Sequence, residues 1–187
     1  MRRAFGAAAL ALLVARIAAS APETPAPEPI TEGRPPEWGL QAGYGFSFSP
    51  NGGRSHEYLF LFEPNVGVRL GPRFEYVAEA HFARYFSPEG YMVGVVPLGA
   101  RYNAPGRTAI RPYAYVGLGL GWTDLAKLDE IDRRFNFLIQ GSVGLRGAVT
   151  ETQAWTFEAR YSHVSNAGTA LPNLGLNCLV FLAGWRF

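Results

Sequence analysis

The sequence of 187 residues has little charge and a single cysteine, Cys178. One cysteine excludes a disulfide bond within the chain. Only 17% of the residues are charged and the formal net charge is +2, so the sequence lacks the basic surface that nucleic-acid-binding proteins need. Continuous helical periodicity is missing after about residue 20, which argues against a helical domain.

Glycine and aromatic residues are abundant, with 22 glycines and an aromatic fraction of 14%. The length suits one domain. Many aromatic residues, much glycine and little charge are typical of an all-β protein with a large apolar outer surface.

The first part of the chain has the pattern of a targeting segment followed by a linker. Residues 1–20 read as a secretory signal peptide, because Arg2 and Arg3 precede a short apolar run and small residues follow it. Residues 21–37 are rich in proline and glutamate and cannot bury much apolar surface, so we expect a disordered linker. The folded domain is expected over residues 38–187.

Eight segments of that domain alternate apolar residues with small or polar ones. In the first segment Trp38, Leu40, Tyr44 and Phe46 fall on one face and glycines, Gln41 and serines on the other. The segments cover about residues 38–49, 58–70, 74–86, 91–102, 110–122, 135–147, 154–165 and 177–187. This pattern predicts an eight-stranded antiparallel transmembrane β-barrel of the bacterial outer membrane. Pro64 interrupts the second segment and predicts a bulge or a bend there.

A soluble lipocalin-like barrel is the alternative that the alternation leaves open, with the apolar face turned inward. Two features favour the membrane barrel. Aromatic residues lie at the ends of the strands, as in membrane girdles, and the last strand ends in Trp185 and Phe187. The terminal Phe187 resembles the signal that barrel assembly machinery reads. If the N-terminus is periplasmic, the short turns fall on the periplasmic side, as expected.

Glu75, Glu79 and His81 share the inward face of the third segment, where carboxylates could suggest acid–base chemistry. We favour the interpretation that they pair with inward arginines in a polar barrel interior. The acidic residues between Thr123 and Arg134 match no calcium-loop spacing. We therefore expect no metal and no cofactor.

The most informative stretch is the end of the chain. His163 and Ser165 lie two residues apart on one predicted strand, on the same face as Trp155, Phe157 and Tyr161. Their parity is that of the lipid-facing residues, and their end of the strand lies near the outer leaflet, which consists of lipopolysaccharide. A polar pair that ends an apolar strip is unusual, but side chains of this kind at a strand end are often only rim residues that form hydrogen bonds in the headgroup layer.

The run Tyr161–Gly168 and the later Pro-Asn-Leu-Gly-Leu-Asn of residues 172–177 resemble the lipid A 3-O-deacylase family (PagL, acyloxyacyl hydrolases). The resemblance implies an outer-membrane barrel that hydrolyses the ester at position 3 of lipid A and releases a 3-hydroxy fatty acid. Lipid A, or lipopolysaccharide, is then the substrate, and outer-membrane lipids surround the protein.

The resemblance also implies roles for single residues. His163 matches the catalytic histidine and Ser165 the nucleophilic serine, while Asn166 and Gly168 match residues that supply oxyanion donors. The family has a glutamate as third member of the triad, and here the corresponding position is Asn177. An amide can hold the imidazole tautomer but cannot give an imidazolium a full countercharge, and an amide in place of the acid costs about 10⁴ in rate in a serine protease.

Two other functions are weighed against the deacylase. The first is a non-catalytic structural or adhesive barrel that retains the motif for loop packing. The second is a barrel with an internal acyl pocket, such as a palmitoyl transferase, for which Glu79 and His81 are the candidates. Besides the substrate, the expected partner is the assembly machinery through Phe187, and a homo-oligomer is compatible with the pattern.

Overall fold

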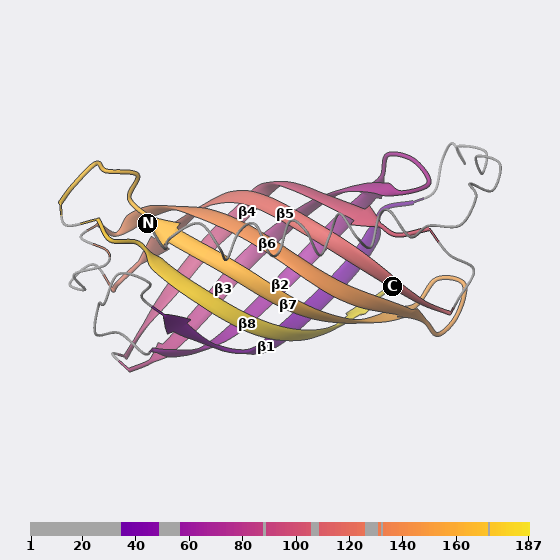
Figure 1. Ribbon diagram of the computed structural model, residues 1–187, viewed down its shortest axis with the longest axis horizontal. Helices are drawn as coiled ribbons and strands as arrows, with labels where there is room; N and C mark the ends of the chain where they lie inside the picture. The colour runs from indigo at the N-terminus through magenta and orange to yellow at the C-terminus, as the bar shows by residue number, and fades with distance from the viewer. Residues whose placement is uncertain are drawn as a thin grey trace, which may run out of the picture.

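The computed structural model describes residues 35–48, 57–87, 89–105, 109–125, 131, 133–171 and 173–187. Within these ranges, eight antiparallel strands close into a barrel in which β1 pairs with β8 (Figure 1). The strands are β1 (Glu37–Phe48), β2 (Tyr58–Arg69), β3 (Phe74–Phe86), β4 (Glu89–Asn103), β5 (Ile110–Thr123), β6 (Phe135–Ala148), β7 (Ala154–Ser165) and β8 (Leu176–Arg186). The predicted signal peptide, residues 1–20, and most of the predicted linker, residues 21–37, lie outside the described residues.

The start of β1 and the end of β8 lie at one rim of the barrel. Trp38 and Phe187 exchange two backbone hydrogen bonds of 3.0 and 2.9 Å there. The connections after β2, β4 and β6 reach the same rim, and the connection from β7 to β8 lies at the opposite one (Figure 1). Closure leaves no unpaired strand edge, which is a requirement for a sheet in hydrocarbon. No helix within the described ranges is both long and apolar enough to cross a membrane.

The outer wall of the barrel is apolar and the inner wall is not. On β1, Trp38 is 58% exposed and Tyr44 66%, whereas Gln41, which points inward, is 3% exposed. The same alternation runs along the other strands, so large hydrophobic side chains cover the outside. This arrangement is the reverse of a soluble lipocalin-like barrel, and it confirms the predicted membrane barrel.

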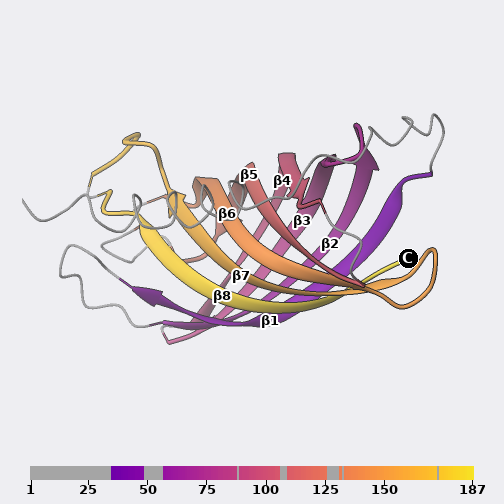
Figure 2. The ribbon, with the colours of Figure 1, turned by 45° about the vertical axis from the view of Figure 1, so that its right-hand side comes forward.

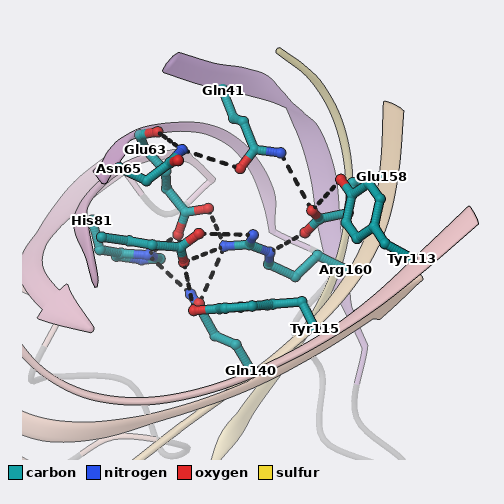
Figure 3. Close-up of polar contacts among 10 residues, drawn as sticks. Gln41, Glu63, Asn65, His81, Tyr113, Tyr115, Gln140, Glu158 and Arg160 are labelled. Carbon is teal, nitrogen blue, oxygen red and sulfur yellow. Dashed lines mark hydrogen bonds and ion pairs between the residues drawn. The ribbon is translucent and has the colours of Figure 1, made fainter. Parts of the chain in front are cut away.

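Polar side chains fill the half of the interior nearer the rim where Trp38 and Phe187 lie. Arg160 of β7 is fully buried and forms ion pairs with Glu63 of β2 and Glu79 of β3 across the barrel, and with Glu158 of its own strand at 2.5 Å. The predicted pairing of Glu79 with an inward arginine is therefore confirmed. Figure 3 shows the surrounding hydrogen bonds, which come from Gln41, His81, Tyr113, Tyr115 and Gln140.

The other half of the interior is mainly apolar, with a few buried polar side chains near its rim, namely Ser47, Glu57, Thr123 and Asn136. The buried cluster there consists of Leu59, Leu61, Ala83, Tyr85, Met92, Val96, Leu125, Ile131, Leu138, Val164, Leu176, Cys178, Val180 and Leu182. Cys178 is a free, buried cysteine within this cluster, as expected for a small packing residue. Val164, Leu176 and Cys178 of this cluster come from the end of β7 and the start of β8. The cluster therefore packs against the inner side of the wall at the β7–β8 connection.

Two register shifts interrupt the sheet, and neither lies at Pro64. The shifts fall between Val77 and Glu79 in the β3–β4 pairing, and between Val95 and Leu98 in the β4–β5 pairing. Pro64 lies opposite Leu40 of β1, and the β2–β3 register is the same on both sides of it. Of the two alternatives predicted at Pro64, a bulge or a bend, the bulge is therefore wrong, because β2 keeps one register with both of its neighbours past this residue.

Candidate active site

The sequence-predicted site lies on the outer wall where β7 and β8 pair, with β6 and β1 on either side (Figure 2). His163 of β7 is directly opposite Asn177 of β8, and Ser165 is opposite Phe137 of β6. His163 and Ser165 are half-buried and alternate with Val164, which is buried inside the barrel. Both side chains therefore belong to the lipid-facing wall, on the strand end farthest from Phe187.

The histidine and the asparagine are in hydrogen-bond contact. His163 Nδ1 lies 2.9 Å from Asn177 Oδ1, and the Tyr161 hydroxyl donates to the same oxygen at 2.6 Å. A carbonyl oxygen only accepts, so in the neutral ring Nδ1 carries the hydrogen and Nε2 has the lone pair. Asn177 is 6% exposed, whereas the histidine and the serine are more open. The Asn177 amide is therefore buried, while the His163 ring remains partly accessible.

Gly175, just before β8, provides the space for the imidazole. Its φ is +74°, and a Cβ built on it would lie 3.1 Å from Nε2 and 3.3 Å from Nδ1 of His163, and closer still to Cε1. The ring therefore packs on the Gly175 backbone. It extends from Asn177 toward the loop end of the strand pair, which is the end where Ser165 lies.

Asn166 organises the loop after β7. Its side chain is fully buried, donates from Nδ2 to the Ala170 carbonyl at 3.3 Å and accepts at Oδ1 from the Gly168 N–H at 2.9 Å. Gly168 has a φ of +78°, and Ala167 before it has a φ of 54°. The two predicted oxyanion donors therefore bind each other in this loop, and their role toward a substrate stays a prediction.

Glu79 and His81 do not join the site. Both are buried in the barrel interior, where Glu79 pairs with Arg160 and His81 Nδ1 contacts Glu63 at 2.8 Å. The structure thus brings together His163 and Asn177 on the outer wall, with Ser165 on the same face. Among the described residues, no group of three or more His, Cys, Asp or Glu side chains is arranged to hold a metal ion.

A family model described as "Lipid A 3-O-deacylase (PagL)" matches residues 31–186. The chain belongs to this family. The PagL family consists of lipid A deacylases, which are ester hydrolases, and its barrel lies in the bacterial outer membrane. A comparison with proteins of curated description gave no match.

Solved structures show the same fold at low sequence identity. The crystal structure of the outer membrane enzyme PagL has a TM-score of 0.63 and 16% identity, and the match covers 77% of this chain and 97% of that one. Neisserial surface protein A (NspA) has a TM-score of 0.62 and 15% identity, covering 81% and 95%. The N-terminal barrel domain of Pseudomonas aeruginosa OprF has a TM-score of 0.50 and 15% identity, covering 81% and 97%.

Sequence reasoning missed two residues at this candidate site. Gly175 stands in the Pro-Asn-Leu-Gly-Leu-Asn stretch, but its part in seating the imidazole depends on the turn that brings β8 back beside β7. Tyr161 shares the outward face of His163, and that parity was the available signal. Its contact with Asn177 runs diagonally across the strand pair, within the reach of an aromatic side chain.

Proposed function

We propose that the protein is a lipid A 3-O-deacylase that works as a serine esterase on the outer wall of the barrel. Ser165 is the nucleophile, His163 the general base and Asn177 the residue that orients the base. The observation that supports this most directly is the 2.9 Å contact between His163 Nδ1 and Asn177 Oδ1 on the wall that also presents Ser165. A histidine that is oriented by a third group, on the same strand face as a serine two residues away, is the kind of arrangement that can activate a hydroxyl.

In the first half of the reaction, Ser165 Oγ attacks the carbonyl carbon of the ester at position 3 of lipid A. His163 Nε2 accepts the hydroxyl proton as the Oγ–C bond forms, and the carbonyl oxygen becomes an oxyanion. N–H donors of the loop that Asn166 and Gly168 build are proposed to bind the oxyanion. When the intermediate collapses, the bond from the acyl carbon to the sugar oxygen breaks, and His163 returns the proton to that oxygen.

In the second half, water replaces the sugar. His163 removes a proton from a water molecule, whose oxygen attacks the acyl carbon of the Ser165 ester. Collapse of this second intermediate breaks the bond to Ser165 Oγ, and the proton goes from His163 back to the serine. The product is a free 3-hydroxy fatty acid, and the enzyme is restored.

The substrate is expected to approach from the membrane. With short turns on the periplasmic side, as in outer-membrane barrels, the β7–β8 loop lies at the outer leaflet. Phe137 and Ile139 of β6 are opposite Ser165 and His163 and are exposed on the same wall. We infer that the acyl chain of lipid A lies against these two side chains while the ester reaches Ser165.

The test is the mass of lipid A extracted from bacteria that express the protein. Loss of one 3-hydroxyacyl chain is expected, and both Ser165→Ala and His163→Ala should abolish that loss. Ser162→Ala is the matched control, because Ser162 lies on the same strand but is buried inside the barrel. Heat-dependent mobility on gels shows that each variant is a folded barrel.

Unchanged lipid A, with every variant folded, would refute the deacylase proposal and favour the alternative of a structural or adhesive barrel. Two further partner predictions stay predictions. They are the recognition of the terminal Phe187 by the barrel assembly machinery and the formation of a homo-oligomer.

A further inference from the structure

The amide of Asn177 creates a problem that a carboxylate at the same position does not have. The two ends of a carboxylate are both acceptors, but an amide has an acceptor at one end and a donor at the other. If the amide turned over, its NH₂ group would donate to His163 Nδ1. The ring hydrogen would then lie on Nε2, and the nitrogen needed as a base would be blocked.

The Tyr161 hydroxyl is placed to prevent this. It donates to Asn177 Oδ1 at 2.6 Å, so the amide oxygen has two donors, the phenol and the imidazole. The phenol ring lies against the ring of Phe48, with 6.2 Å between centroids. Phe48 is directly opposite Asn177 on β1. Its contact with the Tyr161 ring therefore keeps the phenol of β7 close to the amide of β8.

We propose that Tyr161 is a positioning residue that keeps the Asn177 amide oxygen turned toward His163. In the part of the chain that the structure describes, Asn177 is the hydrogen-bond partner of this hydroxyl. Turning the amide over would leave the hydroxyl hydrogen without an acceptor on a lipid-facing wall. One such hydrogen bond shifts the ratio of the two orientations by about tenfold. The inference rests on the proposed function for its catalytic meaning.

The first experiment measures the histidine tautomer directly and does not depend on activity. Protein labelled with ¹⁵N at histidine is studied by NMR in detergent micelles, at a pH where the His163 ring is neutral. Signals of His163 are assigned by their loss in His163→Gln. The hydrogen is expected on Nδ1 in the wild-type protein and partly on Nε2 in Tyr161→Phe. A wild-type ring with hydrogen on Nε2, or an unchanged tautomer in Tyr161→Phe, would overturn the inference.

The second experiment is a double-mutant cycle on lipid A hydrolysis. Tyr161→Phe is expected to lower kcat by about three- to tenfold with little change in KM, because it affects the base rather than substrate binding. In the Asn177→Glu background the same change should cost less than about twofold, since a carboxylate has no wrong orientation. Equal costs in both backgrounds would overturn the inference.

Tyr44→Phe is the matched control, because Tyr44 also faces outward, is 66% exposed and lies on β1 away from the site. It should leave kcat unchanged. If the wild-type protein and Asn177→Glu both leave lipid A intact, the proposed function fails, and the tautomer measurement still decides whether Tyr161 orients the amide.

Discussion

A methyl group added at Gly175 should disable the site without unfolding the barrel. The Cβ of Gly175→Ala would lie 3.1 Å from His163 Nε2, and closer to Cε1, whereas ordinary contacts of a Cβ begin at 3.4 Å. The imidazole must then move by roughly 1 Å or turn away from Asn177, and a misplacement of that size costs about 10² in rate. The positive φ of +74° adds a backbone cost of about 1–2 kcal/mol to the free energy of folding.

The assay is kcat for release of 3-hydroxy fatty acid from lipid A in micelles, together with the free energy of unfolding in urea. Gly168→Ala is the comparison, because its φ of +78° is similar but an added Cβ meets nothing within 4 Å. Both variants should lose similar stability, which separates the backbone cost from the clash with the ring. Gly168→Ala is a control for stability only, because Gly168 belongs to the loop proposed to bind the oxyanion. Retention of kcat within about threefold in Gly175→Ala would refute the reasoning that the glycine seats the ring.

Three further predictions test other parts of the account. Asn177→Glu should raise kcat by about tenfold or more, because a carboxylate stabilises the imidazolium, and an unchanged kcat would show that Asn177 does not hold the third position. Arg160→Met should lower the free energy of unfolding in urea by about 3–5 kcal/mol, since it strands three buried carboxylates, whereas the exposed Arg111→Met should change it little. Leu118→Arg, on the lipid-facing side of β5, should destabilise the barrel in lipid vesicles by about 2–4 kcal/mol; a smaller effect in vesicles than in micelles would contradict its lipid exposure.

The strands could be predicted closely from the sequence, because a membrane barrel has a strict two-residue period. The predicted limits of Phe74–Phe86 and Ala154–Ser165 agree with β3 and β7. The two register shifts could not be predicted, since they depend on how β4 fits between its neighbours. The division of the interior into a polar and an apolar half could be predicted only in part. The inward-facing Leu59 and Leu61 can be assigned to one half only when the register of all eight strands is known.

Parity was enough to predict that His163, Ser165 and Asn177 share one face, and the register places two of them directly opposite each other. The contact of Tyr161 with Asn177 and the space above Gly175 depend on side-chain rotamers and on a left-handed turn, which alternation does not describe. The hydrogen bond between Asn166 and Gly168 likewise belongs to a loop whose shape the sequence pattern left open.

The central claim is that Ser165 is a hydroxyl activated by His163 on the outside of the barrel. The most direct measurement is covalent labelling of the protein in micelles with an alkyl fluorophosphonate, followed by peptide mass spectrometry. The account predicts one adduct, on Ser165, that forms much more slowly in His163→Ala. An unlabelled Ser165 in the folded wild-type barrel, or labelling that is equally fast without the histidine, would contradict it.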